Sequence, residues 1–248
     1  MISAGADGIG LEIARAFARE GARVHVCDVD EKALGRLALT DPAMSHSVCD
    51  VASREQVARF FEEGLAKLGG LDCLVNNAGI AGPTGRVEEI DPGEWDRCLA
   101  VDLTGQFNCV RLAVAHLRRS RNASIMNVSS LAGRLGFAMR APYASAKWGV
   151  VGLSRSLAVE LGPDNIRVNA LLPGIIAGDR QKRVLGAKAE ARGVSFEEME
   201  RIAFSYTSLK EYVTPQQLAD LVVFVASPRG RMISGQALSV CGDTNMLA

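Results

Sequence analysis

The sequence lacks the patterns that mark metal-binding, disulfide-bonded, membrane-spanning and nucleic-acid-binding proteins. Its three histidines are isolated and its six cysteines are scattered without a C-x-x-C pair, which argues against zinc motifs and favours buried thiols in a reducing compartment. No apolar run reaches the roughly 18 residues that a membrane-spanning helix needs, and no secretory signal pattern opens the chain. The 28 basic residues balance the 28 acidic ones without a basic stripe. We therefore expect a cytoplasmic protein without a metal site, and no nucleic-acid or membrane partner.

Alternating strand-like and helix-like segments predict an α/β fold. With 248 residues the chain is long enough for one large domain with a substantial core. Short apolar runs alternate with stretches in which apolar residues recur at helical spacing, and no repeat, linker or low-complexity segment divides them. This order predicts a Rossmann-like, doubly wound, mostly parallel sheet of about seven strands with helices on both faces. The expected strands are 2–4, 23–27, 45–49, 71–75, 124–128, 166–172 and 236–241.

Three segments carry further expectations. One long helix is expected to run through 95–117 and another from 143 to 161. The segment near 178–212 is charged and expected to be helical, and we interpret it as an insertion that can close over a site as a lid. The first strand is short for the centre of a parallel sheet, so either native residues precede Met1 or this strand is unusually short.

A glycine-rich turn lies between the first strand and the first helix. Gly5, Gly8 and Gly10 precede a helix that we expect to begin at Leu11 and to end near Glu20. Glycines at such a turn let the backbone approach a pyrophosphate, which then lies at the helix N-terminus where N–H groups are unpaired. The spacing alone is weak evidence, because glycine-rich turns also connect other elements. It becomes informative together with the acidic residue that follows.

Asp28 ends the second expected strand, eighteen residues after Gly10. An acidic side chain at this place can accept hydrogen bonds from the adenosine ribose hydroxyls, and it would repel a 2′-phosphate. Asp30 and Glu31 add negative charge nearby, so the sequence favours NAD over NADP. The alternative is that Asp28 only caps the helix that begins near Glu31.

Further polar or small residues follow the other strands. Asp50 and Val51 can flank an adenine ring, and Ala78 and Gly79 leave room for a flat cofactor. The paired asparagines Asn76 and Asn77, directly before Ala78, can tie neighbouring strand ends together through their side-chain amides. In a doubly wound sheet, ligands bind beyond the carboxyl ends of the strands. The residues expected to meet there are the glycine turn, Asp28, Asn77, Ser130 and Pro173.

Tyr143 and Lys147 are the centre of the predicted chemistry. They are four residues apart in a segment of helical spacing, so one face of the helix carries both. A phenol is a poor base at neutral pH, but a neighbouring ammonium favours the phenolate, and a serine such as Ser130 can hold a carbonyl or alkoxide oxygen. Taken singly, Y-x-x-x-K occurs by chance and a serine after a strand is usually a helix cap. Together they indicate proton transfer to and from a secondary alcohol.

At this point the chain resembles the single-domain short-chain dehydrogenases/reductases over essentially its full length. The resemblance implies that Ser130 positions the substrate, that Tyr143 is the general acid/base, and that Lys147 binds the nicotinamide ribose and supports the phenolate. It also implies hydride transfer to or from NAD, and a homodimer or homotetramer formed through the two long helices. The matching residues are Gly8, Ile9, Gly10, Asp28, Asp50, Asn76–Gly79, Ser130, Tyr143, Lys147, Asn169, Pro173 and Gly174.

The sequence thus predicts one dinucleotide-binding and catalytic domain, 1–248, acting on a small alcohol or ketone. The expected catalytic residues are Ser130, Tyr143, Lys147 and Asp102. Ser130, Arg140 and Arg180, or Arg183 in its place, are candidates for binding the substrate. The arginines could meet a carboxylate or phosphate, or could be solvated surface charges. The expected cofactor-binding residues are Gly5, Asp7, Gly8, Ile9, Asp28, Val29, Asp50, Val51, Asn77, Ala78, Gly79, Tyr143, Lys147, Pro173, Gly174 and Ile176.

Four positions depart from the family pattern. Ala4 stands where the family has a glycine, Gly178 where it has a threonine, and the common D-G-G near the C-terminus is Cys241-Gly-Asp243. Asp102 replaces the asparagine of the family's proton relay. An ionised carboxylate cannot donate a hydrogen bond and disfavours a nearby phenolate, although its oxygens could hold a water. A catalytically silent scaffold or sensor that binds a dinucleotide is therefore an alternative, whereas a sugar-nucleotide epimerase would need a larger substrate domain.

Overall fold

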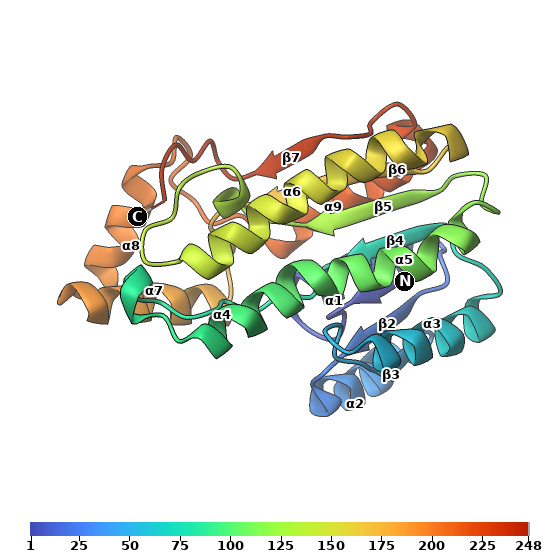
Figure 1. The fold of residues 1–248 in the computed structure, drawn as a ribbon, viewed down its shortest axis with the longest axis horizontal. Coiled ribbons are helices and arrows are strands. Elements are labelled where there is room, and N and C mark those ends of the chain that lie inside the picture. Colours follow the sequence, from blue (N-terminus) through green and yellow to red (C-terminus); the bar gives the residue numbers. More distant parts are fainter. Residues whose placement is uncertain (248) are drawn as a thin grey trace.

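A single parallel sheet of seven strands forms the centre of the computed structural model (Figure 1), which describes residues 1–247, apart from the side chain of Arg180. Every pairing between these strands is parallel, in the order β3-β2-β1-β4-β5-β6-β7. The doubly wound sheet predicted from the sequence is confirmed. Its strands are β1 (Ile2–Ser3), β2 (His25–Asp28), β3 (Ser45–Val48), β4 (Cys73–Asn76), β5 (Ser124–Val128), β6 (Arg167–Pro173) and β7 (Ala237–Val240).

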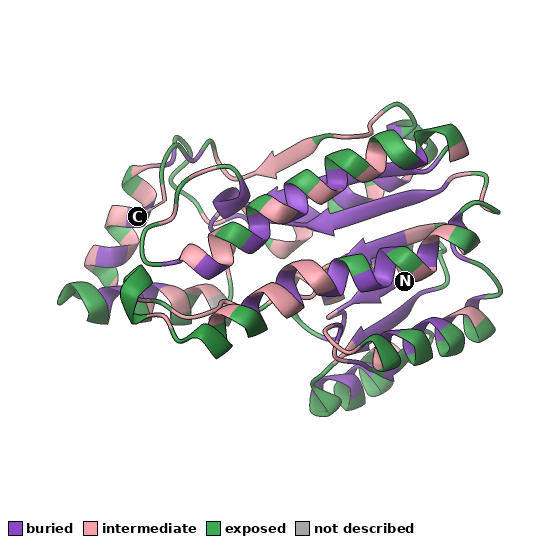
Figure 2. Cartoon of the chain, in the orientation of Figure 1, coloured by how far each residue is buried: buried purple, intermediate pink, exposed green. Residues whose placement is uncertain are grey.

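Helices cover both faces of the sheet. Each layer buries its own hydrophobic cluster against the strands, so the central strands are buried on both sides, as Figure 2 shows. One layer packs around Phe60, Cys109 and Leu117, the other around Ile13, Leu37 and Val222. The first layer holds α3 (Arg54–Leu68), α4 (Pro92–Leu99), α5 (Gly105–Leu117) and α6 (Ala141–Leu161); the second holds α1 (Gly8–Arg19), α2 (Glu31–Thr40) and α9 (Pro215–Ala226).

Short polar residues set where several helices begin. The side chain of Asp30 accepts hydrogen bonds from the backbone N–H groups of Lys32 and Ala33, and therefore caps α2. Ser53 caps α3 in the same way. Because Asp30 caps α2, the alternative that Asp28 serves only as this cap is wrong.

The long helix expected through 95–117 is interrupted. A π-helical turn, Ala100–Thr104, separates α4 from α5. Such a turn inserts extra backbone into the helix and changes the direction of the side chains that follow. Asp102 lies in this turn and is fully buried. The sequence pattern did not reveal the interruption, because apolar spacing continues across it.

The charged segment forms two helices, α7 (Asp179–Arg192) and α8 (Phe196–Ser205). They share a small core of their own that includes Leu185, Met199 and Ala203. Figure 1 shows both helices beyond the arrowheads of the strands, at the carboxyl edge of the sheet. Within 1–247, no helix has the length and apolarity to cross a membrane, and no three potential metal-ligating side chains gather.

Candidate active site at the carboxyl edge of the sheet

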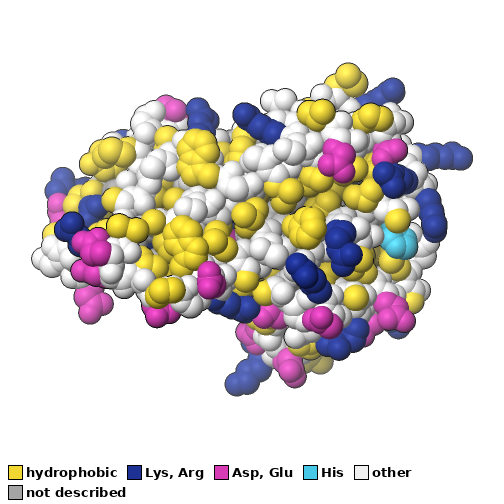
Figure 3. Space-filling view, in the orientation of Figure 1, with side chains coloured by type: hydrophobic (Ala, Val, Ile, Leu, Met, Phe, Trp, Pro, Cys, Tyr) yellow, Lys and Arg dark blue, Asp and Glu magenta, His cyan; other side chains and the backbone are white. Residues whose placement is uncertain are grey.

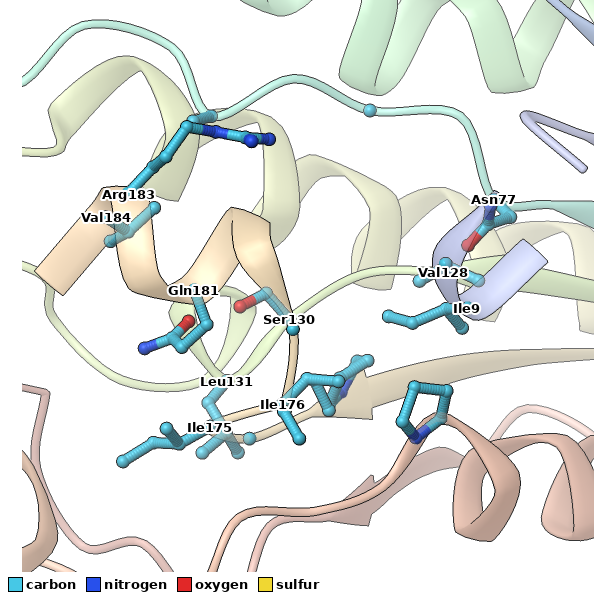
Figure 4. A pocket seen from close by; sticks show the side chains of 18 of the residues that line it. Ile9, Asn77, Val128, Ser130, Leu131, Ile175, Ile176, Gln181, Arg183 and Val184 are labelled. Carbon is cyan, nitrogen blue, oxygen red and sulfur yellow. The ribbon is translucent and has the colours of Figure 1, made fainter. Parts of the chain in front are cut away.

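A cavity of about 910 Å³ lies at the carboxyl ends of the strands. It extends from the start of α1 to α7, and Figure 4 shows Ile9 and Asn77 at one end and Gln181, Arg183 and Val184 of α7 at the other. The convergence predicted from the sequence is confirmed. The predicted site residues on its wall are Asp7, Gly8, Ile9, Asp28, Asn77, Gly79, Ser130, Arg140, Tyr143, Lys147, Pro173, Gly174 and Ile176.

The glycine turn places backbone directly against the cavity. Gly8 has a φ of 54° and begins α1, while a Cβ at Gly10 would lie 2.0 Å from the carbonyl oxygen of Ala4. Ala4 itself has a φ of 50°, a left-handed conformation that favours glycine. The Asn77 amide donates to the Ala4 carbonyl oxygen at 2.9 Å, which ties the turn to β4. The turn thus accommodates an alanine by adopting a conformation that costs free energy.

Asp28 is held in one orientation at the end of β2. Its carboxylate accepts hydrogen bonds from the backbone N–H of Ala6 at 3.2 Å and from that of Asp30 at 3.1 Å. The side chain is half-buried and lines the cavity. These two bonds leave lone pairs of the carboxylate available to a ligand, since each ionised oxygen can accept more than one hydrogen bond.

Several predicted cofactor residues lie away from the cavity wall. Gly5 packs against Val26, and Ala78 is half-buried. Val29 is on the surface, 63% exposed. Asp50 forms an ion pair with Arg97 at 2.9 Å. Val51, also predicted, is buried. None of these predicted residues is among the described residues that line the cavity.

Ser130, Tyr143 and Lys147 all line the cavity. The Ser130 hydroxyl accepts a hydrogen bond from the N–H of Ala132 at 3.2 Å, so it caps a short turn and faces the cavity as well. Tyr143 lies in the first turn of α6. The ammonium of Lys147 is buried, lies 5.5 Å from the centroid of the Tyr143 ring, and donates to the Val128 carbonyl oxygen at 3.2 Å.

Asp102 contacts Lys147 rather than the cavity. Its Oδ2 lies 3.1 Å from the Lys147 ammonium, and its Oδ1 accepts a hydrogen bond from the N–H of Ile80 at 2.7 Å. A Cβ at Gly79 would lie 3.1 Å from the Lys147 nitrogen and 3.2 Å from the Asp102 Oδ2, so a larger residue there would crowd this ion pair. Asp102 is absent from the described cavity wall, and in this arrangement the carboxylate holds the ammonium directly.

The arginines that are candidates for binding the substrate lie in different surroundings. Arg140 is only 2% exposed; it donates to the Ala81 carbonyl oxygen, and its guanidinium carbon lies 5.2 Å from the centroid of the Tyr143 ring. The interpretation of Arg140 as a solvated surface charge is therefore wrong. Arg183 is exposed and lines the cavity. The side chain of Arg180 lies outside the described part of the chain.

Lys188 and Phe137 are among the residues of the cavity wall that sequence reasoning missed. Lys188 on α7 is 8% exposed, and its ammonium lies 4.0 Å from the centroid of the Phe137 ring. Burial, together with the charges of Arg140 and Arg192, lowers the pKa of Lys188 to about 7. In the sequence, Lys188 is one of several basic residues in a charged helix, and no local signal shows which of them faces inward.

Comparison with known proteins decides the family. Residues 4–243 match the family model described as Enoyl-(Acyl carrier protein) reductase. The chain belongs to the short-chain dehydrogenase/reductase family. It is an oxidoreductase of alcohol and ketone substrates with a nicotinamide dinucleotide as cofactor.

Relatives match this short-chain dehydrogenase/reductase over nearly its whole length. It is 35% identical to trans-4-hydroxycyclohexanecarboxylate dehydrogenase of Sinomonas cyclohexanicum, over 98% of this chain and 90% of that protein. It is 32% identical to the 3-oxoacyl-[acyl-carrier-protein] reductase FabG of Thermotoga maritima, over 98% and 95%. Among solved structures, a variant actinorhodin polyketide ketoreductase with NADPH superposes with a TM-score of 0.91 at 31% identity, covering 97% of this chain and 95% of that one.

Proposed function

We propose that this chain is an NAD-dependent dehydrogenase of secondary alcohols, or the reverse ketone reductase, with Tyr143 as the general acid/base. The observation that carries the proposal is that one cavity brings Asp28, Ser130, Tyr143 and Lys147 together. Asp28 comes from β2, Ser130 follows β5, and the other two lie on α6, so a ligand in this cavity can contact three separate elements.

The residues present fit a nicotinamide dinucleotide. The absence of a side chain at Gly8 would let a pyrophosphate approach the N-terminus of α1, and the carboxylate of Asp28 would accept hydrogen bonds from the adenosine ribose. Lys147 would contact the nicotinamide ribose at the other end. When bound, the cofactor accepts or supplies the hydride of the reaction.

The protein's own groups would handle the proton. The Ser130 hydroxyl can donate a hydrogen bond to the substrate oxygen. The Tyr143 hydroxyl would give a proton to that oxygen in reduction, and the Tyr143 phenolate would take the proton from it in oxidation. The Lys147 ammonium lies 5.5 Å from the centroid of the Tyr143 ring, where its positive charge would stabilise negative charge that develops on the Tyr143 oxygen during the transfer. Helix α7 covers the cavity from one side and would help to exclude water.

The preference for NAD rests on the charge of Asp28. A carboxylate held against the ribose pocket would repel the 2′-phosphate of NADP. Asp30 also lines the cavity and adds a second negative charge at that end. The substrate is a small alcohol or ketone; trans-4-hydroxycyclohexanecarboxylate dehydrogenase, a relative, acts by its name on a hydroxylated carboxylate.

We also propose that the enzyme is a homodimer or homotetramer formed through α4, α5 and α6. Three hydrophobic residues of these helices are exposed, namely Phe107, Trp148 and Val159 at 44%, 51% and 81%. Figure 3, which faces these helices, shows hydrophobic side chains across this surface. Exposed apolar side chains gathered on one face are typical of subunit interfaces.

Turnover by the wild-type protein and by Tyr143→Phe tests the proposed reaction. We expect the wild type to reduce NAD in the presence of members of a panel of secondary alcohols, and we expect Tyr143→Phe to lose about 10²- to 10⁴-fold in kcat. NAD should raise the melting temperature of both proteins. The matched control is Tyr206→Phe, because Tyr206 does not line the cavity. Equal turnover by wild type and Tyr143→Phe would refute the role of this tyrosine.

The same experiment distinguishes the proposed dehydrogenase from the alternative, a catalytically silent scaffold that binds the dinucleotide. The ion pair of Asp102 with Lys147 motivates that alternative, because the carboxylate offsets part of the charge that would support a phenolate. A scaffold predicts that NAD raises the melting temperature while no substrate in the panel is turned over. No thermal shift with either dinucleotide would contradict both functions.

A further inference from the structure

Two cations from separate segments lie beside the ring of Phe137. The guanidinium carbon of Arg140 is 5.3 Å from the centroid of this ring, and the ammonium of Lys188 is 4.0 Å from it. Arg140 precedes α6, whereas Lys188 lies in the middle of α7. Both side chains are more than 90% buried, and both line the cavity that contains Tyr143.

The placement of Lys188 follows from the register of α7. Val184 faces the cavity in Figure 4, and Lys188 is four residues later, so the two side chains share one face of the helix. Lys182 and Lys188 are both lysines of α7, but Lys182 is exposed and away from the cavity wall. Lys188 is thus a buried lysine on the inward face of a helix whose other lysine is solvated.

The charges around Lys188 are predominantly positive. Those that act on its ammonium belong to Arg140 and Arg192, and none of the ion pairs among the described side chains includes Lys188. Asp179 is the acidic residue of α7 on the cavity wall, nine positions earlier and about 13 Å away along the helix axis. A buried cation without a counter-charge is costly, and an anion beside it removes that cost.

We propose that Lys188 and Arg140 form a subsite for an oxyanion carried by the substrate, so that the enzyme acts on secondary alcohols or ketones that bear a carboxylate or a similar anionic group. The proposal rests on the proposed function of Tyr143. The guanidinium of Arg140 is 5.2 Å from the Tyr143 ring centroid, so the anion would bind close to the reacting carbon. This proximity favours small substrates in which few bonds separate the two groups.

Kinetics with matched substrates tests the subsite. Each hydroxycarboxylate is paired with its methyl ester and with a phosphate monoester of the same carbon skeleton. The measured quantity is the ratio of kcat/KM for the anionic substrate to that for the neutral ester. We expect the wild type to favour an anionic substrate. Lys188→Met keeps the length of the side chain and should lower the ratio about ten- to hundredfold, because it removes one charge-assisted hydrogen bond.

Two variants keep the result interpretable. Lys182→Met removes a lysine from the exposed side of α7 and should leave the ratio as in wild type. Lys188→Arg keeps the charge and should recover part of the preference. Comparing the phosphate with the carboxylate tells which anion the subsite accepts. Equal ratios in Lys188→Met and Lys182→Met, or a wild-type preference for the neutral ester, would overturn the proposal and leave Lys188 with only its contact with Phe137.

Binding without turnover separates this proposal from the proposed reaction. Calorimetric titration with cyclohexanecarboxylate, which carries no hydroxyl, measures the subsite even if no alcohol is oxidised. We expect binding to wild type in the presence of NAD, and a weakening of at least about tenfold in Lys188→Met, equivalent to 1.4 kcal/mol. Turnover of neutral alcohols combined with no binding of the carboxylate would reject the subsite and retain the function of Tyr143.

Discussion

The carboxylate of Asp102 lies 3.1 Å from the ammonium of Lys147, and both side chains are almost completely buried. The π-helical turn between α4 and α5 directs the carboxylate toward α6, and the backbone at Gly79 leaves the space for it. An ion pair of this kind holds the lysine in place, but it also offsets part of the positive charge near Tyr143. Asp102 therefore influences the site through Lys147, as a positioning residue.

Asp102→Asn tests this relationship. Removal of the carboxylate leaves a buried cation without its partner, so we expect the free energy of unfolding to fall by about 3 kcal/mol. The unopposed ammonium favours the phenolate more strongly, so the pH at which alcohol oxidation reaches half its maximal rate should move to lower values. Urea unfolding and a pH–rate profile measure the two effects.

Asp50→Asn is the matched control for the stability effect. Asp50 also pairs with a basic residue, Arg97, but that pair is at the surface, and we expect a loss of less than about 1 kcal/mol. If Asp102→Asn and Asp50→Asn lower the free energy of unfolding equally, the buried ion pair contributes no more to stability than the surface pair. An unchanged pH profile in Asp102→Asn would show that the carboxylate does not act on the proton transfer.

Asp28→Asn tests the basis of cofactor preference. The amide oxygen can still accept the hydrogen bond from the N–H of Ala6, but the negative charge is lost. We expect the ratio of kcat/KM for NAD to that for NADP to fall at least about tenfold, which corresponds to 1.4 kcal/mol. Glu31→Gln, which removes a charge outside the cavity, should leave the ratio unchanged. A wild-type enzyme that prefers NADP would contradict the assignment to Asp28.

The burial of His25 predicts how the free energy of unfolding depends on pH. The side chain is buried between β2 and α3, stacks on Phe60 with the centroids 5.3 Å apart, and bonds the hydroxyls of Ser45 and Ser47 at 2.8 and 3.0 Å. Burial, followed by the charge of the chain's N-terminus, lowers the pKa of His25 from 6.5 to about 4. Below pH 6.5 the unfolded chain binds a proton that the folded protein does not, so stability falls between pH 6.5 and 4.

Urea unfolding at pH 7 and pH 5 measures this effect. We expect the free energy of unfolding of the wild type to fall by about 2 kcal/mol more than that of His25→Asn over this interval. His46→Gln, which removes an exposed histidine, should follow the wild type. A parallel loss of stability in wild type and His25→Asn would assign the pH dependence to other groups.

Many of the elements and the centre of the site could be predicted, because they depend on local patterns. Tyr143 and Lys147 are one helical turn apart wherever α6 packs. Asp28 ends one parallel strand, and Asn77 and Ser130 follow two others; the carboxyl ends of these strands lie at one edge of the sheet. Asp50 and Val51 also follow a strand, yet the structure turns them toward Arg97 and the core. The strand pattern specifies the edge but not the direction of each side chain.

The sequence by itself determined the parallel sheet, the turn at the start of α1 and the pair on α6, since periodicity and spacing along the chain are sufficient for each. Only the tertiary structure decided that Asp102 reaches Lys147 and that Lys188 meets Arg140 beside Phe137. These contacts join segments far apart in the sequence. They exist because a π-helical turn rotates one side chain inward and because α7 packs across the cavity, and neither feature has a local signature.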